Sequence, residues 1–133
     1  MKRLIRLFAL AIGLSQGSIA QAAWTLIGRT DIFRIYVEDK QITRSGDFAL
    51  ILQLTDYTVA QWVDPRTAIG SIRHQIEFDC RQRLVRILSA AAFSEQMEAG
   101  SLIASEKLTN PEWTQIDPES TAEKVEKFAC RKE

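Results

Sequence analysis

The stretch IGSIRHQIEFDC, residues 69–80, has the most regular pattern in the chain. Ile72, Ile76 and Phe78 take one phase of a two-residue repeat, and charged or polar residues take most of the other. Such alternation is typical of a β-strand that buries one of its two faces. His74 falls in the apolar phase between two isoleucines, so we expect it on the core face of this strand.

Further segments on both sides of this stretch also have strand character. They are Trp24–Gly28, Phe33–Glu38, Phe48–Tyr57, Leu84–Ser94 and Ser101–Leu108. Their β-branched and aromatic content favours strands over helices, and turn-forming clusters such as residues 44–47 and 80–83 separate them. Residues 58–67 are expected to form one long, irregular loop. The pattern predicts an antiparallel sheet of about six strands.

The C-terminal segment has a different period. Residues 120–123, Ser-Thr-Ala-Glu, form a capping box, in which the serine hydroxyl accepts from the glutamate N–H and the glutamate reaches back. Ala122, Val125, Phe128 and Ala129 then make an apolar stripe at helical spacing. We therefore expect a C-terminal helix that lies on the sheet.

The first 22 residues have the order of a secretory signal. Basic residues precede the short apolar run Leu7–Leu14, and the small-x-small pattern of Ala20 and Ala22 follows. The alternative is a membrane anchor, but the run is far shorter than the roughly 20 residues that span a bilayer. We expect cleavage after Ala22, which leaves residues 23–133 as one domain. Because no cysteine follows the signal, we expect no lipid anchor.

The chain has two cysteines, Cys80 at the end of the 69–80 strand and Cys130 near the edge of the helical stripe. An exported protein folds in an oxidising compartment, so we expect the two to pair. The alternatives are two free thiols or two metal ligands, but the chain has a single histidine, and we expect no metal and no cofactor. The expected fold is therefore α+β, mainly β: the sheet carries one C-terminal helix tied on by the disulfide.

Charge argues against one class of partner. Three of the 17 basic residues lie in the signal segment, which leaves 14 against 17 acidic residues and a net charge of −3. Binding to nucleic acid depends chiefly on a basic surface that neutralises phosphates. We therefore expect no nucleic-acid partner.

Several short motifs are spread over residues 23–133. They are Asp56–Tyr57, Ser71, Glu77–Cys80, Arg86, Phe93–Ser94, Met97, Gly100, Trp113, Pro118, Ser120, Glu123 and Cys130. Their order resembles the surface-adhesin E family of short exported Gram-negative proteins. The resemblance implies an antiparallel sheet with a C-terminal helix held by the two cysteines, and adhesion to host molecules. The adhesin that names the family is a lipoprotein, whereas this chain lacks a lipidation cysteine.

Two surfaces are candidates for contact with a partner. Trp62 and Arg66 lie in the expected loop, and loops on rigid sheets commonly carry binding residues; the alternative is a loop that folds back over Trp62. A Cys80–Cys130 bridge would also bring Arg81 and Arg83 close to Arg131 and Lys132. Four cations around one bridge could bind a sulfated glycan or a lipid phosphate. The alternative is that these cations complement the helix dipole or are simply solvated.

The sequence gives no positive support for an active site. None of the common nucleophile, zinc or phosphate-loop motifs is present. We therefore expect an exported, non-enzymatic binding protein, in the periplasm or outside the cell, whose partner is a protein or an anionic glycan or lipid. Two alternatives stay open. One is a periplasmic structural or accessory protein that binds an envelope component, and the other is a small hydrolase that uses His74.

Overall fold

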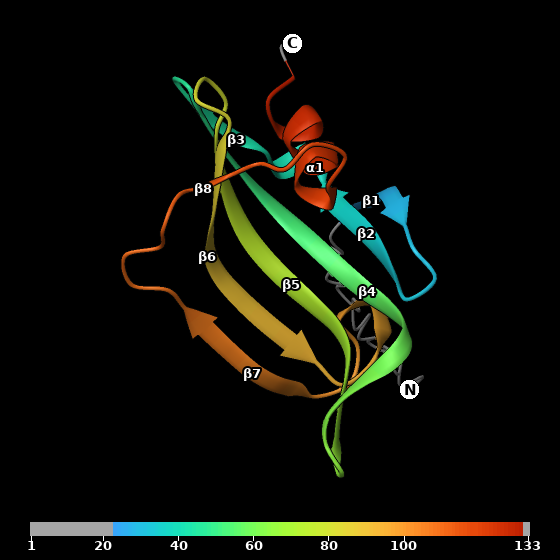
Figure 1. The fold of residues 1–133 in the computed structure, drawn as a ribbon. Helices are drawn as coiled ribbons and strands as arrows, with labels where there is room; N and C mark the ends of the chain where they lie inside the picture. The colour runs from blue at the N-terminus through green and yellow to red at the C-terminus, as the bar shows by residue number, and fades with distance from the viewer. Residues whose placement is uncertain (1–22, 132–133) are drawn as a thin grey trace, which may run out of the picture.

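The computed structural model describes residues 23–131, and the predicted signal segment lies outside them. One curved antiparallel sheet makes up most of the molecule (Figure 1). Its strands are β1 (Trp24–Arg29), β2 (Phe33–Glu38), β3 (Thr43–Ser45), β4 (Phe48–Asp64), β5 (Thr67–Asp79), β6 (Leu84–Phe93), β7 (Leu102–Lys107) and β8 (Thr114–Gln115). The order is β1-β2-β4-β5-β6-β7, with β3 against β4 and β8 against β6. The predicted sheet is confirmed as a six-strand path with two short strands beside it.

Helix α1 (Thr121–Ala129) covers one end of one sheet face, which we call the helix face (Figure 1). On that face Ala49 and Ile51 of β4 stand opposite Phe78 and Ile76 of β5. These four residues are buried and form the core together with Val125 of α1, which is fully buried. Burying a side chain such as Phe78 contributes about 1.5–3 kcal/mol. The core therefore uses the apolar phase that the sequence predicts.

The predicted cap begins helix α1. The Ser120 hydroxyl accepts a hydrogen bond from the Glu123 N–H at 3.2 Å. The Glu123 carboxylate reaches back and accepts from the Glu119 N–H at 3.4 Å. The Ser120 bond satisfies one of the N–H groups left unpaired at the helix start, and the Glu123 bond holds the residue before the cap.

The expectation that residues 58–67 form a loop is wrong. Strand β4 runs on to Asp64, and β5 begins at Thr67. Pairing with β2 ends at Tyr57 and pairing with β6 ends at Ser71, so beyond these points β4 and β5 pair with each other. They form a hairpin that projects from the sheet (Figure 1), and we call residues 58–70 the arm. Because the arm has no core beneath it, its sequence lacks the alternation that marks the other strands.

The connection between β6 and β7, which includes the 3₁₀ helix η2 (Gln96–Glu98), crosses the face opposite the helix, and we call it the crossing loop. Buried Asp56 of β4 accepts a hydrogen bond from the Met97 N–H at 2.7 Å. The Ser71 hydroxyl of β5 donates to the Glu95 carbonyl at 2.7 Å and accepts from the Glu98 N–H at 3.0 Å. These bonds satisfy buried polar groups of both strands and anchor the loop to the sheet. A second 3₁₀ helix, η1 (Asp39–Gln41), follows β2.

Candidate functional site

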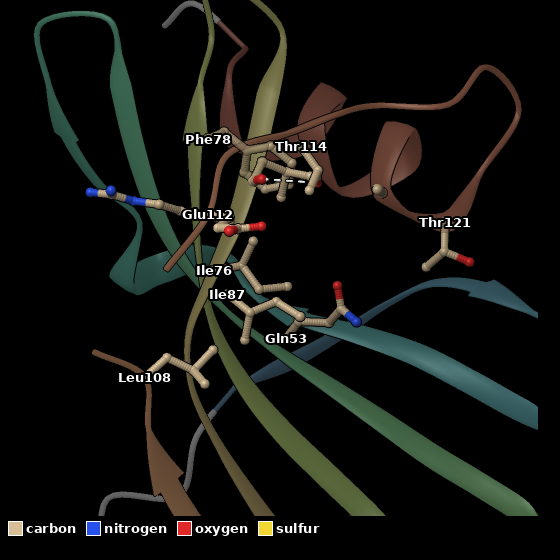
Figure 2. A pocket seen from close by; sticks show the side chains of 11 residues that line it. Gln53, Ile76, Phe78, Ile87, Leu108, Glu112, Thr114 and Thr121 are labelled. Atoms are coloured by element: carbon tan, nitrogen blue, oxygen red, sulfur yellow. Dashed lines mark hydrogen bonds between the residues drawn. The ribbon is translucent and has the colours of Figure 1, made fainter. Parts of the chain in front are cut away.

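A pocket of about 410 Å³ opens on the helix face of the sheet, beside the start of α1 (Figure 2). Its apolar lining comes from Ile76 and Phe78 of β5, Val85 and Ile87 of β6, and Leu108 after β7. Ile87 and Leu108 are 42% and 38% exposed, so this part of the apolar surface continues from the core into solvent. The volume lies in the range of small-molecule binding pockets.

Two charged residues, Arg86 and Glu112, line this pocket, and they point in different directions. Arg86 alternates with Val85 and Ile87, so its side chain leaves toward the opposite face of the sheet. There its Nη2 lies 2.6 Å from the Glu77 carboxylate and its guanidinium lies 4.2 Å from the centre of the Trp113 ring. The Glu112 carboxylate instead lies over the apolar lining (Figure 2) and has no ion-pair partner within residues 23–131.

The arm is the second candidate surface. Val59, Trp62 and Val63 are 57%, 68% and 58% exposed, so the described part of the chain does not fold back over Trp62. Arg66 lies in the turn at the tip, where its N–H donates to the Asp64 carboxylate at 2.8 Å. This bond and one from the Thr67 hydroxyl lower the pKa of Asp64. The arm thus presents apolar side chains next to a well-defined polar turn.

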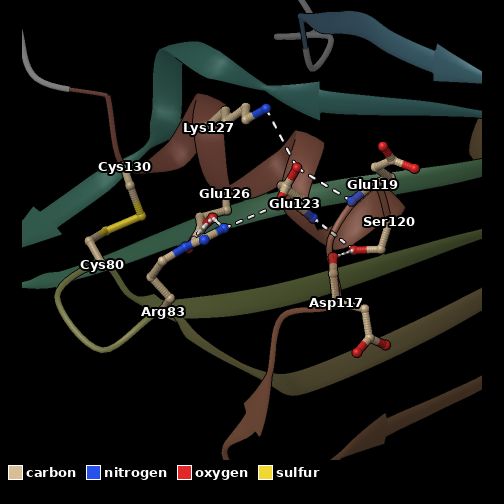
Figure 3. A network of polar contacts seen from close by, with 9 residues as sticks. All are labelled: Cys80, Arg83, Asp117, Glu119, Ser120, Glu123, Glu126, Lys127 and Cys130. Carbon is tan, nitrogen blue, oxygen red and sulfur yellow. Dashed lines mark hydrogen bonds and ion pairs between the residues drawn. A yellow bond between two sulfur atoms is a disulfide. The ribbon is translucent and has the colours of Figure 1, made fainter.

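The predicted basic cluster is brought together only in part. A pocket of about 590 Å³ beside the disulfide is lined by Arg81 and Arg131, and also by Arg44 from β3. Arg83 points elsewhere, toward helix α1 (Figure 3), and Lys132 lies outside the described residues. Arg44 was not predicted to belong to this cluster, because the β3–β4 hairpin approaches the disulfide only in the folded sheet.

Two of the cations that line this basic pocket, Arg44 and Arg131, make contacts with other parts of the chain. The Arg44 Nε donates to the Ala129 carbonyl at 3.0 Å. The Arg131 guanidinium lies 4.3 Å from the centre of the Phe128 ring, and its Nη2 lies 3.8 Å from the Asp39 carboxylate. Part of the positive charge is therefore used to hold the end of α1.

Arg83 forms ion pairs with helix α1 beside the confirmed Cys80–Cys130 disulfide (Figure 3). Its Nη2 lies 2.8 Å from one Glu126 oxygen and 3.2 Å from a Glu123 oxygen. Arg83 donates hydrogen bonds to Glu126 and to Glu123, which raise the pKa of Arg83, and the bond that Glu123 accepts from Arg83 lowers the pKa of Glu123. The β5–β6 turn is thus joined to α1 by one covalent bond and by ion pairs.

His74 lies on the helix face, opposite Gln53 of β4 and Ala90 of β6. Its Nδ1 is buried and has no hydrogen-bond partner, and burial lowers the pKa of the ring. A hydrolase would need a carboxylate or hydroxyl beside this nitrogen. Residues 23–131 provide neither, nor do they contain a group of three or more potential metal ligands.

The motif residues behind the family resemblance have structural contacts here. Asp56, Ser71 and Met97 anchor the crossing loop. Gly100 has φ of 78° and allows the loop to pass close to Ser94, whose hydroxyl would lie 2.2 Å from an added Cβ. These motif residues therefore stabilise the fold rather than mark the place where a partner binds. Sequence reasoning missed the pocket under Glu112, because its lining comes from segments that meet only in the sheet.

Comparison with solved structures supports the same fold. The structure of crystal form II of Haemophilus influenzae protein E matches with a TM-score of 0.62 at 12% sequence identity, over 83% of this chain and 88% of that chain. The crystal structure of protein E from non-typeable Haemophilus influenzae matches with a TM-score of 0.59 at 11% identity, over 88% of this chain and 81% of that chain. At such low identity these similarities establish the fold alone.

The family comparison covers most of the sequence. No protein of curated function matches this chain. In the part of the chain that the structure describes, no helix is both long enough and apolar enough to cross a membrane. A model of the surface-adhesin protein E family matches residues 24–131. This chain therefore belongs to the surface-adhesin protein E family.

Proposed function

We propose that this protein is exported, has no enzymatic activity, and binds a partner macromolecule at the cell surface through its arm. Family membership supports an adhesive role. The signal-like pattern of residues 1–22 supports export, as does a disulfide, which persists in oxidising compartments. The surroundings of His74 give catalysis no support.

The observation that carries this proposal is the exposure of three large apolar side chains on the arm, Val59, Trp62 and Val63. Exposed apolar clusters are costly in water and commonly mark interaction sites. Tryptophan and arginine are enriched among residues that dominate binding energy, and Trp62 lies near Arg66 at the arm tip. The arm also stands clear of the sheet, so a large partner can approach it from both sides (Figure 1).

The first experiment determines where in the cell the protein is located. Intact cells are labelled with a membrane-impermeant biotin reagent and compared with an osmotic-shock fraction. We expect labelling on intact cells or recovery from the medium. Protection until the outer membrane is opened would contradict surface adhesion and favour the periplasmic accessory role.

Binding through the arm is then measured with residues 23–133 on matrix laid down by cultured epithelial cells. Changing Trp62 and Val63 to serine should weaken retention about 30-fold, because truncating a dominant interface residue costs at least about 2 kcal/mol. Leu102→Ser is the matched control, since Leu102 is 57% exposed on β7, outside the arm. Equal retention of all three proteins would refute a role for the arm.

The basic pocket beside the disulfide supports a second candidate, an anionic glycan or lipid phosphate. Arg81 and Arg131 line it together with Arg44. Arg81→Glu combined with Arg131→Glu should shorten retention on a heparin column, whereas Arg66→Glu, on the arm, should not. No change in the double variant would dispose of this candidate.

A further inference from the structure

The pocket on the helix face is separate from the arm and from the basic pocket, and it has its own chemistry. Its floor is apolar and joins the core through Ile76 and Phe78. Its outer part, Ile87 and Leu108, stays partly exposed. Covering that surface would remove apolar area from water, which is favourable. A ligand for this site therefore needs an apolar body.

Neighbouring residues hold Glu112 in position over this floor. The ring of Trp113 packs against Phe48 with centroids 5.9 Å apart and also stacks on the Arg86 guanidinium. Thr114 pairs with Val85 in the sheet, and its hydroxyl donates to the Val85 carbonyl at 3.2 Å. Trp113 thus lies on the face opposite the helix face. Glu112 and Thr114 line the pocket on the helix face (Figure 2).

Glu112 is exposed at the edge of the pocket, where its carboxylate has no cation beside it among residues 23–131. Arg86 is committed to Glu77 on the opposite face, at 2.6 Å. Within the described part of the chain no cation pairs with Glu112. A carboxylate above an apolar floor complements a ligand that carries a positive charge at one end.

We propose that this pocket binds a small amphipathic amine, with an alkyl body on Ile76, Ile87 and Leu108 and its ammonium group at Glu112. The volume of about 410 Å³ accommodates a small molecule. The site lies on the helix face, away from Trp62, so binding of an amine here does not depend on adhesion through the arm.

The test compares three probes that share a hexyl chain: hexylammonium, 1-hexanol and hexanoate. Each is titrated into ¹⁵N-labelled residues 23–133, and the amide signals of Ile76, Ile87 and Thr114 are followed. We expect hexylammonium to bind up to about fivefold more tightly than hexanol, as an exposed ion pair allows. Hexanoate should bind more weakly than hexanol, because its carboxylate faces Glu112.

Two variants separate the charge from the apolar floor. Glu112→Gln should abolish the preference among the three probes, whereas Glu106→Gln, on β7, should leave it unchanged. Ile87→Thr, which keeps a β-branched residue in β6, should weaken hexylammonium and hexanol together. Equal affinities for all three probes, an unaltered preference in Glu112→Gln, or shifts outside the pocket would each overturn the proposal.

Discussion

Replacing both Cys80 and Cys130 by alanine should lower the free energy of unfolding without detaching the helix. The two residues are separated by 50 positions, and their Cα atoms lie 5.6 Å apart in the fold. On the chain-entropy model, opening a loop of that length costs about 4 kcal/mol, because the unfolded chain gains conformational freedom. The folded state keeps most of its contacts, since Val125 and Ala129 stay buried against the sheet.

The magnitude is measurable by equilibrium unfolding in urea, followed by tryptophan fluorescence. A loss of about 4 kcal/mol in a domain of this size lowers the melting temperature by on the order of 15–30 °C. Helical signals in the far-ultraviolet spectrum and the amide resonances of α1 should remain native below the transition. The oxidised parent protein is the reference, and the reduced parent should match the double variant.

Two results would contradict this role of the disulfide. A loss below about 1 kcal/mol would mean that the bridge hardly constrains the unfolded chain. A large loss accompanied by disappearance of the α1 resonances would mean that the bridge holds the helix in place and that Val125 packing is too weak to do so. The second result would also mean that the Arg83 ion pairs with α1 do not form without the disulfide.

Three further predictions concern single residues. Gly70→Ala should destabilise the protein by about 1–3 kcal/mol in urea unfolding, because the new Cβ would lie 2.4 Å from the crossing-loop backbone. Gly28→Ala serves as its control, since the Cβ there meets a side chain at an ordinary 3.5 Å. Equal effects of the two changes would be evidence against the close approach at Gly70. Arg83→Met should lower stability by leaving buried Glu126 without its partner, and adding Glu126→Gln should recover part of the loss; a double-mutant cycle with no coupling would contradict this. Burial lowers the pKa of His74, so the unfolded state binds more protons, and stability should fall as the pH drops below about 6.5. His74→Gln should flatten this slope, and an unchanged slope would assign it to other groups.

Local patterns were sufficient for much of the fold. Alternation predicted β5 and placed His74 on the correct face, because a strand with one buried face must repeat every two residues. The cap at Ser120 predicted the start of α1, since orphan N–H groups at a helix start need nearby acceptors. Cysteine count and an export signal predicted the disulfide.

Residues 58–67 show where local reasoning failed. The irregular pattern of this stretch, which includes Pro65, indicated a loop, yet β4 and β5 continue through most of it as a paired hairpin. Alternation of apolar and polar residues arises where a strand buries one face against a core. The arm packs against no core, so its strands do not show this alternation.

Local sequence patterns were enough to predict a disulfide-linked antiparallel sheet with a C-terminal helix, because strand periodicity, helix capping and cysteine count are short-range or compositional properties. Which charged side chains are paired and which are available to a ligand depends on the folded arrangement. The fold turns Arg83 toward Glu126, places Arg44 beside Arg81, and leaves Glu112 over an apolar pocket. These outcomes depend on which strands become neighbours and which face each side chain takes, and residues distant in the chain settle both.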